Sequence, residues 1–180
     1  MAAPPASPGT SPRRGSFAFL ARFAGFLVLF YLLVALRPIN DHVIVPFTAG
    51  IARASGALLR TLGEPVSVEG TEIRSSSFAV QIENGCNGLE TILLFVSAVL
   101  AFPAAARWRA AGLLVGFASI EAFNLLRVAS LVWVGGHRPA LFSSFHTILW
   151  QSLVVLFGVL LFLFWAARAG SRARRAEAVR

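Results

Sequence analysis

Long apolar stretches constrain the fold of this chain more than any other feature of its sequence. An α-helix needs about 20 apolar residues to cross a hydrocarbon core of roughly 30 Å. Four runs approach or exceed that length, namely residues 17–36, 88–106, 110–134 and 147–167. Only 13% of the residues are charged, whereas about a quarter are charged in soluble domains. The sequence therefore predicts an all-α polytopic membrane protein with about four transmembrane helices.

The distribution of arginines predicts how these helices are oriented. The net charge of +8 would suggest nucleic acid binding in a soluble chain, but basic residues beside apolar spans instead set membrane orientation, so no nucleic acid partner is expected. Arg13 and Arg14 precede the first span, Arg107 and Arg109 separate the second from the third, and the basic tail 169–180 follows the fourth. Four crossings place all three groups on one side. We therefore predict cytoplasmic termini in a bacterial inner (plasma) membrane.

The remaining segments have patterns of their own. Residues 1–16 are rich in Pro, Ala, Ser and Gly and predict a disordered leader, followed by a single membrane domain over 17–168. A signal peptide is the competing interpretation of the first span, but no small-residue cleavage site follows Leu36. Residues 39–62 have apolar side chains at helical spacing and predict an amphipathic helix on the outer surface rather than a fifth span. Residues 63–81 alternate at period two and predict a small extracytoplasmic β-hairpin.

The only cysteine, Cys86, comes directly before the second span, in the segment Asn84-Gly85-Cys86-Asn87-Gly88. A single cysteine excludes an intramolecular disulfide. It can be a small buried hydrophobic residue, as lone cysteines often are. It can also be reactive, because the N–H groups at a helix N-terminus favour a thiolate.

Two further polar residues are predicted at the same depth as Cys86. Arg127 lies twenty residues beyond the cytoplasmic Arg107, roughly 30 Å along a helix. Asn124 presents a second polar group to nearly the same face, although an arginine near an interface can simply snorkel to water. His146 begins the fourth span on the outer side, with a preceding serine as its candidate helix cap, and alone it could be merely solvated. Together the thiol, guanidinium and imidazole are the groups that a cysteine protease needs.

Three motifs carry a resemblance to a known family. Cys86-Asn87-Gly88-Leu89-Glu90, Asn124-Leu125-Leu126-Arg127 and Phe145-His146 with Trp150-Gln151 resemble the signatures of the exosortase/archaeosortase family. The residues of these motifs are most similar to the type called exosortase H, and the resemblance covers roughly residues 60–165. Many members of the family have about eight spans, so this chain would be a compact version.

The resemblance implies a membrane-embedded cysteine protease and transpeptidase. It makes Cys86 the nucleophile, Arg127 its cationic partner and His146 the acid and base. The implied substrates are exported proteins with a C-terminal sorting signal, which consists of a Pro-containing motif (Ile-Pro-Thr-Leu in the H type), a transmembrane helix and a basic tail. No cofactor or metal is implied.

Four more residues are candidates for a supporting role: Asn87, Glu90, Glu121 and Asn124. Glu90 follows the cysteine by one helical turn and could orient the imidazole or pair with the guanidinium. Glu121 is deeper in its span, where a carboxyl group must be paired or protonated. The sequence does not choose between these roles.

Other functions remain as alternatives. A non-catalytic membrane scaffold or an assembly factor for protein or polysaccharide export would not need the three polar residues. An acyltransferase or a redox partner could use the same thiol, but a redox role lacks a second cysteine to resolve a disulfide. The acyl acceptor, the oligomeric state and the group that activates the thiol are not predicted.

Overall fold

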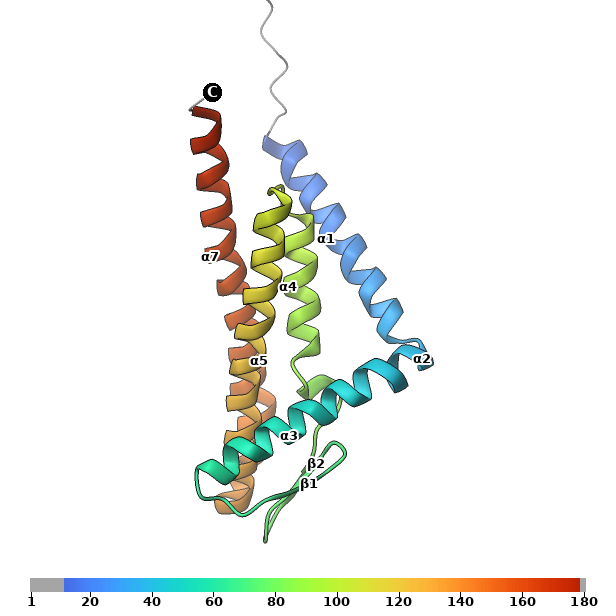
Figure 1. Ribbon diagram of the computed structural model, residues 1–180, viewed down its shortest axis with the longest axis vertical. Helices are drawn as coiled ribbons and strands as arrows, with labels where there is room; N and C mark the ends of the chain where they lie inside the picture. The colour runs from blue at the N-terminus through green and yellow to red at the C-terminus, as the bar shows by residue number, and fades with distance from the viewer. Residues whose placement is uncertain (1–11, 179–180) are drawn as a thin grey trace, which may run out of the picture.

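The computed structural model describes the backbone of residues 12–178, which forms a helical bundle with a small sheet at one end (Figure 1). Helices α4 (Leu89–Ala101), α5 (Ala106–His137) and α7 (Gln151–Ala178) lie side by side in the bundle. Helix α1 (Pro12–Val34) packs against α4. The start of α1, the end of α7 and the α4–α5 connection lie at one end, here called the terminal end. The opposite end is called the sheet end. The three arginine-bearing segments therefore share one end of the bundle.

The predicted fold class is confirmed: the chain is an all-α polytopic membrane protein with a small sheet. Within the described residues, four helical segments are long and apolar enough to cross a membrane, namely Gly15–Val34, Arg37–Thr61, Ala106–His137 and Pro139–Ser171. The predicted second span, 88–106, is not in this set, because α4 has only 13 residues and rises about 20 Å. Pro103 restricts Phe102 to an extended conformation (φ −74°, ψ 135°), which ends α4 at Ala101.

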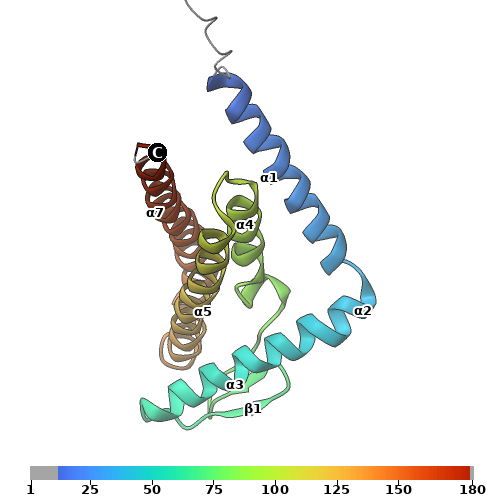
Figure 2. The same ribbon diagram turned by 45° about the horizontal axis from the view of Figure 1, so that its top comes forward.

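The segment Arg37–Thr61 has the length and composition of a span but runs crosswise to the bundle. It comprises α2 (Arg37–Ile39), the π-helical segment η1 (Asn40–Ile44) and α3 (Val45–Thr61). Figures 1 and 2 show α3 lying across the sheet end instead of along the other helices. This placement fits the amphipathic helix predicted for residues 39–62. The helical spacing of Phe47, Ile51, Ala54 and Leu58 predicted its apolar face. In the structure Ala54 is exposed, whereas Ala52 and Ser55 are buried.

The predicted hairpin is extended by a third strand. The sheet is antiparallel, in the order β1-β2-β3, with bounds Ser67–Glu69, Glu72–Arg74 and Ala79–Gln81. Gly70 supplies the first turn with φ +57°, a conformation that favours glycine. Ile73 is fully buried in the cluster that joins the sheet to α3 and α5. Because β3 ends five residues before Cys86, this packing fixes the backbone that enters the candidate site.

The helix that carries His146 begins earlier than predicted. The sequence predicted spans over 110–134 and 147–167, with a loop between them, but α5 continues to His137, and α6 (Pro139–Ser144) starts after a single residue. Ser143 and Ser144, the candidate helix caps, both lie inside α6, so the cap prediction is wrong. A π-helical turn, η3 (Phe145–Trp150), follows and continues into α7. Such turns occur mostly as local insertions in α-helices, frequently at functional sites.

The two ends of the chain are only partly covered by the structure. Residues 1–11 of the predicted leader and residues 179–180 of the tail lie outside the described residues. Pro12–Ser16, predicted as leader, already belong to α1, and α7 extends through most of the predicted tail to Ala178.

Candidate active site

The structure brings together the three residues singled out from the sequence, although they come from distant parts of the chain. Cys86 ends a short 3-10 turn, η2 (Asn84–Cys86), before α4. Its Sγ lies 2.9 Å from Nε2 of His146 in the π-helical turn. Nη2 of Arg127, on α5, lies 3.9 Å from the same sulfur. The thiol therefore contacts a group that can take its proton and a cation that can stabilise its thiolate.

The backbone after Cys86 depends on a glycine. Gly88 has φ +80°, a conformation that costs other residues roughly 1–2 kcal/mol. A Cβ at this position would also lie 2.6 Å from Oε1 of Glu121 and 3.2 Å from Cγ of Asn124. Both requirements, the positive φ and the close approach of α5, explain why a glycine separates the cysteine from α4.

Asn87 anchors the same segment through two hydrogen bonds. Its side chain is fully buried. Nδ2 donates to Oγ1 of Thr48 on α3 at 2.8 Å, and Oδ1 accepts the backbone N–H of Leu89 at 3.1 Å. Non-helical backbone within a membrane protein must be satisfied by protein or water, and here an asparagine ties it to the neighbouring helices.

Arg127 is held by a residue to which the sequence interpretation assigned no role. The side chain is 2% exposed, and Nη2 donates to Oε1 of Gln151 at 3.2 Å. Gln151 belongs to one of the recognised motifs and comes five residues after His146. The i→i+5 hydrogen bonding of a π-helical turn brings residues at this spacing closer to one face than an α-helix would. The π-helical turn is the feature that lets one segment present both an imidazole to the thiol and an amide to the guanidinium.

An aromatic side chain positions the imidazole of His146. The ring of Phe142, one turn earlier, stacks on it with centroids 5.7 Å apart and planes only 3° from parallel. Within the described part of the chain, no carboxylate accepts a hydrogen bond from His146. The arrangement is therefore a Cys–His pair oriented by stacking.

The surroundings of Cys86 act in opposite directions on the pKa of its thiol. Burial, the largest influence, raises the pKa of Cys86, while the Arg127 guanidinium lowers it. The carboxylates of Glu83 and Glu90 raise the pKa, and a hydrogen bond from the Glu83 backbone to the Cys86 side chain lowers it. Because the net direction is upward, a thiolate at this position would need a group that takes the proton, and the imidazole of His146 is in contact with the sulfur.

The remaining candidates occupy different surroundings. Glu90 is exposed on α4, and among the described residues it has no hydrogen bond or ion pair with His146 or Arg127. Glu121 is 7% exposed and Asn124 is fully buried. Both line the space behind Gly88, and within residues 12–178 their polar atoms lack hydrogen-bond partners of good geometry. They form the polar wall against which the cysteine segment packs.

Comparison with known proteins identifies the family. No curated protein and no solved structure matches this chain. A family model described as transmembrane exosortase (Exosortase_EpsH) matches residues 13–170, a range that includes Cys86, Arg127, His146 and Gln151. The match spans nearly the whole bundle and agrees with the resemblance carried by the three motifs. The chain therefore belongs to the transmembrane exosortase family.

Proposed function

We propose that this protein is a membrane-embedded cysteine peptidase or transpeptidase that cleaves C-terminal sorting signals of exported proteins. The observation that carries the proposal is the 2.9 Å distance between Cys86 Sγ and His146 Nε2. A nucleophile and its general base are expected within about 2.6–3.2 Å of each other. Membership of the exosortase family supports a peptidase-like enzyme.

The reaction follows from these groups. His146 Nε2 takes the thiol proton, and the Cys86 thiolate attacks the carbonyl carbon of the scissile peptide bond. The C–N bond then breaks, His146 returns the proton to the leaving amine, and the acyl group stays on Sγ as a thioester. Water, or the amine or hydroxyl of an acceptor, attacks the thioester and releases free Cys86.

Arg127 has a separate task in this scheme. The backbone N–H of Cys86, a natural donor to the oxyanion, already donates to the Glu83 carbonyl oxygen at 2.8 Å. The guanidinium of Arg127 is therefore the charged donor available beside the sulfur. Preorganised donors of this kind stabilise the negative charge that develops in acyl transfer.

The topology agrees with a substrate that carries a transmembrane helix and a basic tail. Basic segments next to transmembrane helices stay in the cytoplasm, a rule that also predicts the orientation of the enzyme. The tail of such a substrate would therefore lie in the cytoplasm, beside the terminal end of the enzyme. Its cleavage motif would then reach the level of Cys86, nearer the sheet end. We therefore place the protein in the inner membrane with cytoplasmic termini and an outward-facing site.

Replacement of the reacting groups tests the proposal. We expect Cys86→Ala to abolish C-terminal processing of a co-expressed reporter that carries a sorting signal, as followed by intact mass. His146→Ala removes the general base and should slow processing by roughly 10²–10⁴-fold. His137→Ala is the matched control, because His137 is half-exposed at the end of α5 and contacts Glu64 and Trp133 instead of the residues of the candidate site. Normal processing by correctly inserted Cys86→Ala would refute the peptidase and favour a scaffold.

A further inference from the structure

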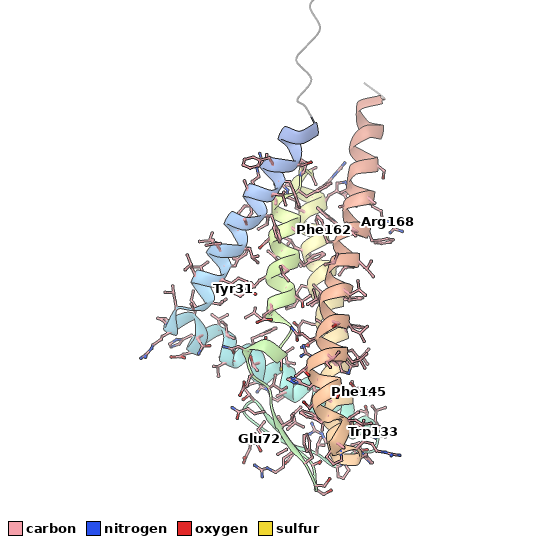
Figure 3. The ribbon with its side chains drawn as sticks, turned by 180° about the vertical axis from the view of Figure 1, so that it is seen from behind. Tyr31, Glu72, Trp133, Phe145, Phe162 and Arg168 are labelled. Atoms are coloured by element: carbon pink, nitrogen blue, oxygen red, sulfur yellow. The ribbon has the colours of Figure 1, made fainter. Side chains whose placement is uncertain are left out.

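An apolar groove lies on the bundle between the level of the candidate site and the terminal end. It has a volume of about 210 Å³ and lies between α1 and α7, with α4 as its floor. Figure 3 shows α1 and α7 on either side of α4, with Phe162 in the space between them. Nothing in the proposed chemistry uses this groove.

The α7 wall of the groove begins at the site. Val155, Gly158, Val159 and Phe162 line it. Their spacing of three and four residues places them on one helix face. Gln151, the partner of Arg127, precedes Val155 by four residues and lies on that face. The wall therefore continues the face that holds the guanidinium.

The α4 floor begins at the same place. Thr91, Phe95 and Ala98 line the groove from α4, again at helical spacing. Thr91 follows Cys86 by only five residues. Floor and wall thus both lead away from the reacting sulfur and toward the terminal end.

The far end of the groove is closed by α1, whereas its side is open. Phe19 of α1 stacks on Phe162 of α7, with ring centroids 6.1 Å apart. Along the open side, Leu20 is 59% exposed and Val159 is 49% exposed. An occupant can therefore enter the groove sideways from the lipid.

The size and lining of the groove suit a helix. The lining is apolar and includes the small residue Ala98, and small residues are enriched where transmembrane helices approach closely. The volume of about 210 Å³ exceeds the roughly 150 Å³ of a cavity that holds benzene. It can therefore take one or two apolar side chains from the ridge of a docked helix.

We infer that this groove binds the transmembrane helix of the substrate, with the helix beginning beside Cys86 and running toward the terminal end. The inference rests on the proposed function, because it takes a substrate whose scissile bond is followed by such a helix. Since the bond must reach Sγ, the following residues must pass Thr91, where the apolar groove begins. Apolar side chains from one face of the helix enter the groove, and the other face remains in lipid.

Site-specific photo-crosslinking tests the groove directly. A photoreactive residue is placed at Val159, in membranes that contain Cys86→Ala enzyme and a full-length reporter substrate. The control position is Leu114 of α5, which is 74% exposed and does not line the groove. Helices α5 and α7 meet where Gly112 packs on Trp165 and where Phe123 packs on Phe157. Leu114 on α5 and Val159 on α7 both lie between these two contacts along their helices, so they are at similar depths in the bundle. We expect substrate crosslinks from Val159 well above those from Leu114. Equal yields would mean that lipid fills the groove and would overturn the inference.

A substitution that fills the groove provides a second measurement. In otherwise wild-type enzyme, Val159→Trp should raise the KM for a helix-bearing substrate by about tenfold, equivalent to roughly 1.4 kcal/mol. Leu114→Trp should leave KM unchanged. An unchanged KM in Val159→Trp would contradict the inference.

The two proposals fail in different ways. Cys86-dependent processing without preferential crosslinking at Val159 would overturn the groove and leave the peptidase intact. Preferential crosslinking at Val159 without Cys86-dependent processing would support helix binding and overturn the peptidase.

Discussion

Removal of the Arg127 charge should make Cys86 less reactive in a manner that depends on pH. In Arg127→Gln the side chain loses its cation, while Cys86 and His146 retain their own side chains. Burial already raises the pKa of Cys86, and Arg127 is the main group that opposes this effect. Without the guanidinium the pKa of Cys86 should rise further, so the thiolate forms only at higher pH.

The size of the effect follows from the geometry. Two unit charges at the 3.9 Å between Arg127 Nη2 and Cys86 Sγ interact by about 4 kcal/mol at an effective dielectric constant of 20, and by about 1 kcal/mol in bulk water. These energies correspond to a loss of between about fivefold and about a thousandfold in the thiolate population below the pKa. The partial burial of Cys86 places the expected value between these limits.

The assay is the rate of alkylation of Cys86 by a small haloacetamide as a function of pH. Cys86 is the only cysteine, so incorporation of label reports this site alone. The rate should rise with pH in the native enzyme, and the rise should move to higher pH in Arg127→Gln. Arg127→Lys keeps the charge and should fall between the two. Arg138→Gln, which changes an exposed arginine, is the control. An unchanged pH profile in folded Arg127→Gln would refute the view that Arg127 stabilises the thiolate.

Three further substitutions test how the site is held. Gly88→Ala places a Cβ 2.6 Å from Glu121 Oε1 in a positive-φ conformation, so thermal unfolding in detergent should show a loss of at least about 1–2 kcal/mol. Asn87→Ala removes the bonds to Thr48 and Leu89 and should lower the free energy of unfolding by roughly 1–3 kcal/mol; unchanged stability would contradict the anchoring role. Gln151→Leu removes the hydrogen-bond acceptor of Arg127. Hydrogen bonds to charged groups contribute roughly 1.5–3 kcal/mol, so this substitution should lower kcat rather than raise KM. An unchanged kcat would show that Arg127 needs no such support.

The convergence of Cys86, Arg127 and His146 in depth could be predicted because helix geometry is fixed. With 1.5 Å per residue, the distance of Arg127 from Arg107, in the first turn of α5, gives its level without a structure. The arginine pattern likewise predicted which segments share one end of the bundle, and Figure 1 shows them together. These inferences use only chain length and charge, which survive any repacking of side chains.

Helix boundaries were less accessible to the sequence. Apolar composition continues through Phe102, and only the effect of Pro103 on that residue shortens α4. The continuity of α6 with α7 was missed because Ser143 and Ser144 favour helix caps as well as loops. The π-helical turn at Phe145–Trp150 has no pattern in the sequence that would have indicated it.

By itself, the sequence determined the fold class, the levels of the polar groups and the family motifs. Which faces of the helices meet was decided only by the tertiary structure. In lipid, apolar side chains gain little hydrophobic free energy by moving from acyl chains to other helices. The pattern of hydrophobic residues therefore does not indicate how a helix is rotated about its axis. The 2.9 Å contact of Cys86 with His146, the bond from Arg127 to Gln151 and the groove between α1 and α7 all depend on that rotation. Close packing around Gly88 and the π-helical turn determine this rotation, because both bring together side chains that regular helix spacing would leave apart.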